Sequence, residues 1–474
     1  MKINMKNQQP TQQELIEITP AQHFDLKNDL ALIAVPLPKK PLEAGSGGFA
    51  IITSAKERFD FNDVMLFQKG YATQRYPSLK PRWSQASVKR FLAGETLGTL
   101  SGAYEEVLKQ LESHIDLEAC EYREVLALWI IGTYMHRYFS AYPYIHLSGH
   151  AGTGKTKTLM LTSLLAFNGR MSTETTAAAL VRLTHDNQST LCMDEIEKLQ
   201  RAKDEMSQTV LAILNVGYKK GAVVSKMEMG RNGKNWELKE FDPYCPKILA
   251  GIRGLDQTLA TRCIPMVLVK SANQEIVNRE VDMEAPIWGE IRDQIYEGIM
   301  SEWQDVRSCT AELWDNEIQG RDWETWKPLL AIAKHLDKTF AGLFDRMRIF
   351  ALEITNQKKQ ALTEESFGGK LLVALHSYFQ KGHQQQKFVS LKELLEYLKM
   401  FYPEMVNDSR SGTLNPWITT RWLGGELRKT GLVTGAAVQR RVGEENVRGY
   451  EIDYTNIKTR MHVYGLNPED GVVL

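Results

Sequence analysis

Short apolar runs alternate with segments of helical periodicity between residues 142 and 269. Three of these runs, at residues 144–147, 190–193 and 246–251, have the length and apolar character of buried strands. A helical segment at residues 158–167 follows the first run. Strands that alternate with helices in this way are typical of a parallel sheet covered by helices. The pattern therefore predicts an α/β domain in the middle of the chain.

The segments on either side have different patterns. Residues 97–115 and 119–138 read as helices, and Trp129 and Tyr134 recur at helical spacing in the second, which is more typical of core packing than of a ligand site. Residues 274–380 read as almost wholly helical. An apolar run at residues 49–53 is strand-like, whereas the tail after residue 388 predicts helices followed by two short strands. Several structural regions therefore surround the α/β domain.

A second kind of strand pattern lies inside the α/β region. Residues 222–229 and 235–241 alternate apolar and polar side chains around a Gly/Asn-containing turn at residues 230–234. This pattern predicts a β-hairpin. Its basic residues are Lys226, Arg231 and Lys234, and a charged hairpin tip can simply be a solvated turn.

Composition limits the possible functions. The chain has 474 residues, 43% of them hydrophobic and 24% charged, with a formal net charge of zero, so overall charge gives no argument for nucleic-acid binding. The five cysteines are scattered without a Cys-x-x-Cys pair, which argues against a zinc ribbon or a disulfide framework. The most apolar stretch, residues 125–134, is too short to span a bilayer, and the N-terminus has no secretory apolar region. We expect a cytoplasmic protein without membrane segments.

The shifts of pattern divide the chain into five expected regions. Residues 1–48 are polar and contain Pro and a Gly-rich run, so we expect a loosely ordered arm and linker. Residues 49–118 are expected to form a small N-terminal domain, 119–270 the α/β core, 271–380 a helical lid or connector and 381–474 a C-terminal domain. In the N-terminal domain, rings and basic side chains alternate, which suits stacking on bases and equally an ordinary amphipathic surface. These residues are Tyr71, Arg75, Tyr76, Lys80, Arg82, Trp83, Lys89 and Arg90.

A complete phosphate-binding loop follows the first predicted strand. Its pattern, G-x-x-x-x-G-K-[ST], stands between a strand and a helix, which is the context that the motif requires. Glycines let backbone N–H groups turn towards phosphate oxygens, Lys155 reaches the outer phosphates, and the Thr156 hydroxyl holds Mg²⁺. A chance Gly-rich turn is the alternative. The residues expected to bind ATP here are Gly149, His150, Ala151, Gly152, Thr153, Gly154, Lys155, Thr156 and, in the following helix, Thr158.

An acidic pair follows the second predicted strand. Asp194 and Glu195 lie after the apolar residues 190–193, and Asp194 is 38 residues beyond Thr156 (194 − 156). An ATPase needs a carboxylate in the Mg²⁺ shell and a base that activates the attacking water. We assign the first role to Asp194 and the second to Glu195. The alternative is a carboxylate pair that caps the next helix.

These motifs and several further segments carry a family resemblance. The segments are residues 128–134, 142–149, 215–222, 241–252, 258–262 and 326–333, so the resemblance covers about residues 120–340. The chain resembles AAA+ ATPases encoded by plasmids, phages and genomic islands, which are related to minichromosome-maintenance and superfamily-three helicases. The resemblance implies an AAA+ P-loop core with a helical lid, and a hairpin at residues 222–241 that points into the pore of a hexameric ring. Lys226, Arg231 and Lys234 of this hairpin would then grip the backbone of a DNA strand.

The resemblance also implies two arginine roles. A Leu-x-x-x-Leu-x-Thr-Arg run at residues 255–262 matches the family's arginine-finger motif, so Arg262 would enter the ATP site of a neighbouring subunit, unless it is a surface arginine paired with an acid. Arg321, just before the helix that contains Trp323 and Trp326, would be the sensor arginine of the lid, acting on the nucleotide of its own or of a neighbouring subunit. The strand that ends at Gly251 lacks the polar sensor residue that AAA+ proteins often carry, and the chain has no recognisable primase module.

The tail resembles a winged helix. Residues 391–401 would form its first helix, 420–430 its recognition-like helix, and 438–442 and 447–452 the wing strands, with the tip near residues 443–446. Basic side chains in such a patch would contact DNA phosphates without reading sequence. Winged helices also mediate protein contacts, which stays the alternative. The candidate DNA contacts are Arg421, Arg428, Lys429, Arg440 and Arg441, with Arg448 beside them.

Taken together, the sequence predicts an ATP- and Mg²⁺-dependent DNA helicase, an AAA+ motor that translocates on single-stranded DNA as a homo-oligomeric ring and replicates a mobile genetic element. Two other functions are compatible with the same motifs. One is an AAA+ remodeller or regulator that hydrolyses ATP without displacing a strand. The other is a replication initiator that uses ATP as a binding switch, against which the water-activating Glu195 argues.

Overall fold

A computed structural model describes residues 15–37, 48–60, 64–73, 75, 77–117, 119–172, 176–202, 204–229, 235–252, 254–365, 367–382, 386–402, 419–442, 445–464 and 466. The chain divides into two units, Met1–Leu352 and Glu353–Leu474. Each unit is described by itself.

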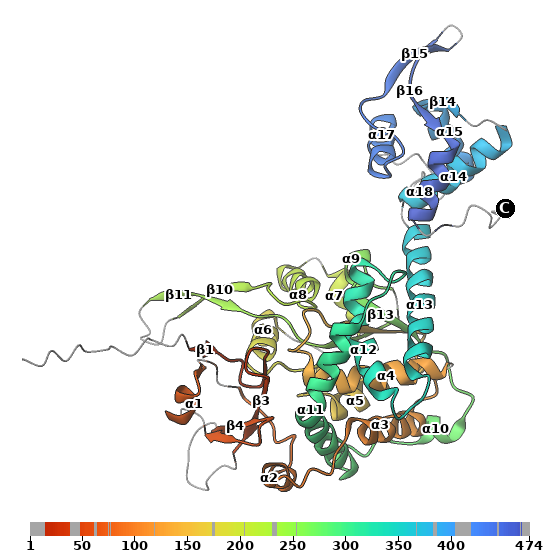
Figure 1. Ribbon diagram of the computed structural model, residues 1–474. Helices are drawn as coiled ribbons and strands as arrows, with labels where there is room; N and C mark the ends of the chain where they lie inside the picture. The colour runs from red at the N-terminus through yellow and green to blue at the C-terminus, as the bar shows by residue number, and fades with distance from the viewer. Residues whose placement is uncertain are drawn as a thin grey trace, which may run out of the picture. The chain divides into compact units, whose positions relative to one another are not determined.

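A five-stranded, wholly parallel sheet forms the centre of the first unit (Figure 1). Its strand order is β13-β7-β12-β9-β8, so β12 lies between the first two strands predicted from the sequence and pairs with both. This confirms the expected α/β domain with its parallel sheet. The strands are β7 (Tyr144–Ser148), β8 (Arg170–Ser172), β9 (Leu191–Met193), β12 (Lys247–Gly251) and β13 (Cys263–Val267).

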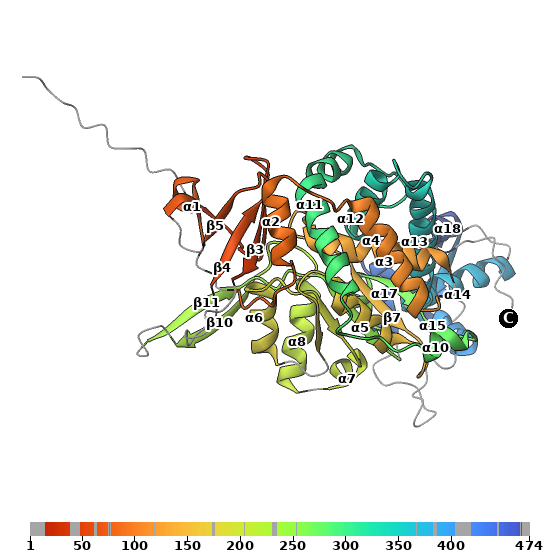
Figure 2. The same cartoon turned by 90° about the horizontal axis from the view of Figure 1, so that it is seen from below.

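Helices cover both faces of this sheet, as a parallel sheet with buried strands requires. Helix α5 (Lys155–Leu165) directly follows the loop after β7 and packs on β8, β9 and β12. On the other face, side chains of three helices form one apolar core with Leu191, Met193 and Leu249. Figure 2 shows these helices on the opposite side of the sheet from α11. They are α6 (Ala177–His185), α7 (Ile196–Arg201) and α8 (Glu205–Val216), with the short α9 (Gln257–Ala260) beyond them.

A layer of longer helices packs beside α5. Helix α11 contacts α3, α5 and α12, and α4 contacts α3 and α12. The apolar positions of α4, including Trp129, are buried, as its helical periodicity predicted. The helices of this layer are α3 (Leu100–His114), α4 (Cys120–Gly132) with the 3₁₀ turn η1 (Thr133–Met135), α11 (Ile287–Glu312) and α12 (Gly320–Leu336). Helices α10 (Gln274–Asn278) and α13 (Leu343–Glu365) complete the helical stretch, so its helical nature is confirmed, whereas its role as a lid stays a prediction.

The N-terminal part of the chain differs from the expected loose arm. A four-stranded antiparallel sheet, β2-β3-β4-β5, includes residues 22–36, and β1 pairs in parallel with β6. The physical reason is the apolar run in β3, whose Leu32 packs with Ile51 and Phe59 into a core of its own. The other expected arm residues, 1–14 and 38–47, lie outside the described residues. The elements are β1 (Ile16–Glu17), β2 (Gln22–Asp25), β3 (Leu30–Pro36), β4 (Phe49–Thr53), β5 (Arg58–Asp60), α1 (Val64–Gln68), β6 (Tyr71–Ala72) and α2 (Gln85–Ala93).

The expected β-hairpin is present. Strands β10 (Val224–Met229) and β11 (Trp236–Phe241) pair antiparallel as a two-stranded ribbon, separate from the central sheet. In Figures 1 and 2 the ribbon extends away from the body of the first unit. The turn residues 230–234, among them Arg231 and Lys234, lie outside the described residues.

The second unit has its own apolar core and a three-stranded antiparallel sheet, β14-β16-β15. Helix α14 places Leu371, Leu375 and Phe379 in this core, so the compact unit includes residues that the sequence analysis assigned to the helical connector. The helices and strands expected in the tail are present at the predicted places. They are α14 (Phe367–Gly382), β14 (Gln386–Ser390), α15 (Leu391–Phe401), α17 (Thr420–Lys429), β15 (Val438–Val442), β16 (Glu445–Asp453) and α18 (Tyr454–Val463).

Candidate functional site

The loop between β7 and α5 has the backbone conformation that a phosphate-binding loop needs. Gly149, Gly152 and Gly154 have φ values of 150°, 77° and 89°, which side-chain-bearing residues rarely adopt. At Gly149 a Cβ atom would lie 2.3 Å from the Leu268 carbonyl oxygen, so the loop's first position also requires glycine for space. The loop then runs directly into the N-terminus of α5, where backbone N–H groups and the helix dipole favour an anion.

Hydrogen bonds from side chains hold the loop closed on itself. The Lys155 ammonium donates to the Gly149 and His150 carbonyl oxygens at 2.7 and 2.8 Å. The Thr153 hydroxyl donates to the His150 carbonyl at 3.0 Å. Thr158 is buried and donates to the Gly154 carbonyl at 3.0 Å, so it supports the first turn of α5 instead of facing a ligand.

The two predicted metal-binding residues, Thr156 and Asp194, lie together at the carboxyl edge of the sheet. The Thr156 hydroxyl donates to Asp194 Oδ2 at 2.8 Å, although the residues belong to segments that follow β7 and β9. This separation is close to the roughly 2.9 Å between neighbouring ligands in a Mg²⁺ octahedron with bonds of about 2.0–2.1 Å. The described residues contain no group of three or more His, Cys, Asp or Glu side chains that could hold a metal ion. One hydroxyl and one carboxylate therefore fit Mg²⁺, which usually keeps waters and phosphate oxygens as its other ligands.

Glu195 has an unusual backbone conformation beside this pair. Its φ and ψ are 54° and 40°, the left-handed region, and its backbone N–H donates to Asp194 Oδ1 at 2.9 Å. Its carboxylate is exposed and forms an ion pair with Lys198, one turn along α7. The sharp turn thus places the Glu195 backbone N–H against the Asp194 carboxylate, while the Glu195 carboxylate contacts Lys198.

His150 and Ala151 line a hollow that adjoins the loop. The hollow has a volume of about 750 Å³, and Ile252 and the residues after β13 form its other wall. Val267 and Val269 contribute exposed apolar side chains to that wall. The loop therefore borders a cavity that is large enough for a small-molecule ligand.

The two predicted arginines lie together, away from the loop. Arg262 precedes β13, which pairs in parallel with β7, so Arg262 lies at the amino edge of the sheet and the loop at the carboxyl edge. Arg321 donates to the Thr261 hydroxyl at 2.7 Å. Both guanidinium groups lie over the Tyr218 ring, 5.2 and 5.8 Å from its centre. The structure thus brings Arg262 and Arg321 to one place and neither to the loop of the same chain.

Local contacts fix the Arg262 side chain. Its Nε donates to the Asn215 carbonyl at 2.5 Å, and its Nη1 to the Thr258 carbonyl. Burial and then the neighbouring Arg321 lower the pKa of the Arg262 guanidinium. Tyr218 was not singled out from the sequence as a functional residue. The sequence around Tyr218 does not reveal a functional contact, because Arg262 and Arg321 lie far from it along the chain.

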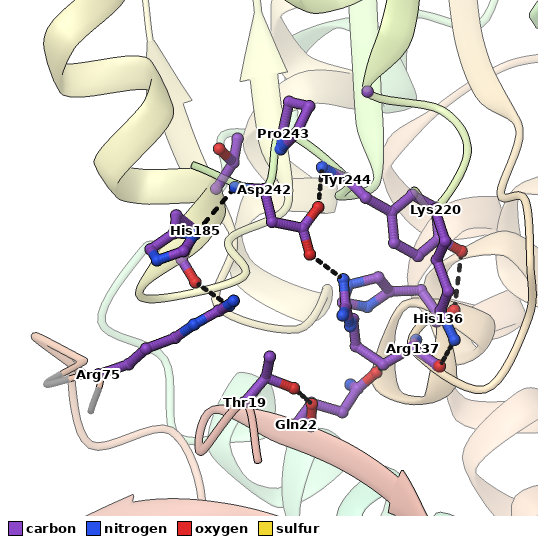
Figure 3. Close-up of polar contacts among 12 residues, drawn as sticks. Thr19, Gln22, Arg75, His136, Arg137, His185, Lys220, Asp242, Pro243 and Tyr244 are labelled. Carbon is purple, nitrogen blue, oxygen red and sulfur yellow. Dashed lines mark hydrogen bonds and ion pairs between the residues drawn. The ribbon is translucent and has the colours of Figure 1, made fainter. Parts of the chain in front are cut away.

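The root of the β10–β11 hairpin is held by a polar cluster, drawn in Figure 3. Arg137 Nη1 donates to Asp242 Oδ2 at 2.7 Å, and the Asp242 backbone N–H donates to His185 Nδ1 at 2.9 Å. The Arg137 backbone N–H donates to Gln22 of the N-terminal sheet at 2.9 Å. Burial lowers the pKa of His185 to about 4, so its imidazole is neutral and Nδ1 can accept. The hairpin, helix α6 and the N-terminal sheet therefore meet at Asp242 and Arg137.

The described rings and two of the arginines of the N-terminal region pack against other parts of the first unit. Tyr71 and Trp83 are buried. Arg75 donates to the His185 carbonyl, and Arg82 to the Ser163 and Ala166 carbonyls. Tyr76 lies outside the described residues. Both described rings therefore pack inside the protein, whereas Lys80 and Lys89 are exposed, so the expected nucleic-acid contacts of this region stay a prediction.

Several basic residues predicted to contact DNA already have partners. In the second unit, Lys429 pairs with Glu426 and Arg440 with Glu451, both at 2.6 Å, while Arg428 donates to the Tyr450 hydroxyl at 3.1 Å. Arg421 and Arg441 are exposed. On the hairpin, Lys226 lies opposite Lys239 and is partly buried.

Comparison with known proteins gives one partial family match and two weak structural matches. A family model described as "Protein of unknown function (DUF3631)" matches residues 268–459, less than half of the chain, and no curated protein matches. A solved structure described as SCCmec type IV Cch, an active helicase, matches 90% of this chain and 79% of its own at 12% identity, with a TM-score of 0.39. The NrS-1 C-terminal region matches 86% of this chain and 94% of its own at 11% identity, with a TM-score of 0.34. These scores are too low for either likeness to carry functional weight.

In the described part of the chain, no helix is both long and apolar enough to cross a membrane.

Proposed function

We propose that the protein is an ATP-hydrolysing AAA+ motor that acts on DNA, a ring-forming helicase in the replication of a mobile genetic element. The observation that carries the proposal is the hydrogen bond between Thr156 and Asp194. It joins a glycine-shaped phosphate loop to a carboxylate from a strand two positions away in the sheet. Such a pair is what a Mg²⁺–nucleotide complex requires.

Hydrolysis follows from the residues beside this pair. Lys155 at the start of α5 would bind the outer phosphates, and bound Mg²⁺ would neutralise charge on them. Glu195 would accept the proton of the attacking water, since it directly follows Asp194 and its backbone N–H donates to the Asp194 carboxylate. A protein that only bound nucleotide would have little use for a base at this position.

A ring explains why Arg262 lies so far from its own loop. The five residues of β13 separate the two edges of the sheet by about 16 Å, which is longer than an arginine side chain. An arginine finger in this position would serve the ATP site of an adjacent subunit. Arg321, which shares Tyr218 with Arg262, would act at the same subunit boundary.

DNA is the proposed substrate because two elements outside the ATP site suit it. The hairpin extends from the first unit with Arg231 and Lys234 in its turn sequence. In the second unit, α15, α17 and the three-stranded sheet have the order of a winged helix, and Arg421 and Arg441 are exposed on it. Such residues would hold the protein on phosphates.

The test combines ATPase and strand-displacement assays on the full chain. Wild-type protein should hydrolyse ATP faster with single-stranded DNA and separate a forked duplex only with ATP. Lys155→Ala should lose nucleotide binding. Glu195→Gln should bind ATP but lose about 10²- to 10⁴-fold in turnover, as expected when a general base is removed.

Each rival function has its own result. DNA-stimulated hydrolysis without strand separation would identify a remodeller or regulator. Binding of ATP without turnover in the wild-type protein would identify an initiator that switches on nucleotide binding. Wild-type rates in Glu195→Gln would contradict the role given to this residue.

A further inference from the structure

One face of the β10–β11 hairpin is apolar and open to solvent. In the strand register, Met227 pairs with Leu238, and Met229 with Trp236. Side chains two residues apart point to the same face of a strand, so these four side chains share one face. They are 55, 64, 52 and 63% exposed, respectively. We call these four residues the apolar hairpin face.

Four of the five charged side chains of the two strands lie on the other face; the fifth, Glu240, pairs with Ser225 at the root end of the apolar hairpin face. On the other face, Lys226 pairs with Lys239, and Glu228 with Glu237. Glu228 also forms ion pairs with Lys239 and with Arg182 of α6, so this charged face is turned towards the body of the unit. Burial and the neighbouring Arg182 lower the pKa of Lys226, which fits a residue held against the protein. The residue that reaches outward from β10 is therefore a methionine and not the predicted lysine.

Four large apolar side chains on a solvent-exposed ribbon call for a partner. A second copy of the chain is a poor match, because a stable interface takes about 800 Å² from each partner and roughly 20–30 residues a side. Four side chains on a two-stranded ribbon cannot supply that alone. Unpaired bases are a better match, since each base has a flat π-face that stacks on an indole and contacts thioethers.

Charge favours the same partner. The turn sequence that joins the two strands, residues 230–234, contains Arg231 and Lys234 and no acidic residue. Along the apolar hairpin face, the Met229–Trp236 pair adjoins this turn. Rings next to basic residues are the combination by which proteins bind single strands without reading their sequence.

We propose that the apolar hairpin face binds the bases of single-stranded DNA, with Trp236 as the stacking ring and the neighbouring methionines and Leu238 completing the platform. The proposal rests on the proposed function in taking DNA as the polymer that activates the ATPase. It changes the expected mode of contact: the hairpin holds bases through its apolar face, and Lys226 does not grip the backbone.

The test removes the ring and the bases independently. Trp236→Ala should weaken binding of an oligo-dT strand by about 5- to 150-fold, the range for loss of one stacked base. The same substitution should leave binding of an abasic strand of equal length unchanged, because that strand has phosphates but no bases to stack. Fluorescence anisotropy of labelled strands measures both affinities, and ATP hydrolysis without DNA should stay at the wild-type rate.

Trp314→Ala is the matched control. Trp314 is 79% exposed in the same unit and its indole donates to Asn316, so its removal deletes an equally exposed ring elsewhere. Trp314→Ala and Lys226→Ala should both bind oligo-dT as the wild type does.

Three results would overturn the proposal. They are wild-type affinity of Trp236→Ala for oligo-dT, an equal loss on the oligo-dT and abasic strands, and dissociation of an oligomer by Trp236→Ala, which would make this face a contact between copies. DNA-stimulated ATP hydrolysis distinguishes failure of the stacking proposal from failure of the proposed function. If only the stacking idea is wrong, DNA still stimulates the ATPase of Trp236→Ala; if the function is wrong, the wild type shows no stimulated hydrolysis either.

Discussion

At the scale of single residues, Glu195 combines an unfavourable backbone with a place beside the metal-binding pair. A residue other than glycine in the left-handed region costs about 1 kcal/mol or more, and such positions cluster at functional sites. The turn is held by the hydrogen bond from the Glu195 N–H to Asp194 and by burial of Ile196 in the core behind it. This hydrogen bond and the burial of Ile196 thus offset the cost of the left-handed backbone at Glu195.

His146, in the middle of β7, makes the first unit sensitive to acid. It is 6% exposed, and burial lowers its pKa from 6.5 to about 4. Between pH 6.5 and 4 the unfolded state therefore binds more protons than the folded state, and the free energy of unfolding falls as the pH is lowered. For one imidazole the loss amounts to about 3 kcal/mol across this window.

We expect His146→Phe to remove this contribution. Urea unfolding of wild type and variant between pH 8 and pH 4 measures it, and the variant should lose about 3 kcal/mol less on acidification. Measurement at pH 8, where both side chains are neutral, isolates any packing effect, and His146→Leu repeats the test with a smaller side chain. Identical pH profiles would show that His146 is not the group that titrates.

The positions of some residues of the candidate site could be predicted from the sequence, and those of others could not. The phosphate loop and Asp194 could be assigned from sequence because each follows an apolar strand, and parallel strands bring their carboxyl ends to one edge. Tyr218 could not, since its contacts with Arg262 and Arg321 depend on how α8 and α12 pack around β13. Thr158 was assigned to the ligand because it follows the motif, but on a helix it faces inward.

At the scale of elements, a set of polar contacts anchors the β10–β11 hairpin to the rest of the first unit. Asp242 lies immediately after β11 and is bound by Arg137, which also contacts Gln22 of β2. Lys220 donates to the Arg137 carbonyl, and burial lowers the pKa of Lys220 to about 8. Asp242 is thus the acid that balances two neighbouring cations and fixes the direction in which the hairpin leaves the body.

Asp242→Asn should loosen this anchor while keeping the local turn. The Asn side chain can still accept from the Tyr244 N–H, as Asp242 does at 2.9 Å, but it carries no charge for Arg137. We expect a loss of about 1.5–3 kcal/mol in the free energy of unfolding, the usual range for a hydrogen bond to a charged group. Hydrolysis without DNA should persist while its stimulation by DNA falls.

Glu312→Gln provides the control for Asp242→Asn. It makes the same kind of change in an exposed pair with Lys334, where an effect below about 1 kcal/mol is expected. Comparable effects of the two substitutions, or full DNA stimulation in Asp242→Asn, would show that the root does not position the hairpin.

Helices and strands could be predicted from the sequence more readily than the contacts that they make with one another. The hairpin, the central strands and the tail helices appear where the periodicity placed them, because each pattern is local. The β2–β3 strands escaped prediction, since polar and Pro-containing sequence flanks them and the core that they form depends on residues 49–71. The apolar hairpin face was visible as alternation, but only the register shows that Met227 and Trp236 share a side.

At the scale of the whole molecule, the parallel sheet separates the two halves of the proposed catalytic machinery. The phosphate loop follows the carboxyl end of β7, whereas Arg262 precedes the amino end of the adjacent β13. One chain therefore offers its nucleotide site at one edge and its arginine pair at the other. Head-to-tail contact between copies would join unlike edges, and repetition of that contact closes into a ring when the rotation allows it.

A mixing experiment tests whether Arg262 acts on a neighbour. Arg262→Ala alone should lose about 10³-fold or more in ATP turnover, as expected for loss of an arginine finger. Lys155→Ala alone should be inactive because it cannot bind nucleotide. In an equal mixture, an Arg262→Ala subunit keeps a working loop and a Lys155→Ala subunit supplies the missing arginine. Random assembly places that combination at about a quarter of the boundaries, so up to about a quarter of the wild-type rate should return.

The control mixes Lys155→Ala with Arg307→Ala. Arg307 forms a surface ion pair with Asp29, so Arg307→Ala alone should hydrolyse ATP at the wild-type rate. Hydrolysis measured across mixing ratios then distinguishes the two cases: rescue should peak near equal amounts only in the Arg262→Ala series. If no ratio restores ATP turnover, Arg262 only stabilises its own chain, through its contacts with Asn215 and Tyr218. The position of Arg262 at the amino edge of the sheet would then no longer support a ring.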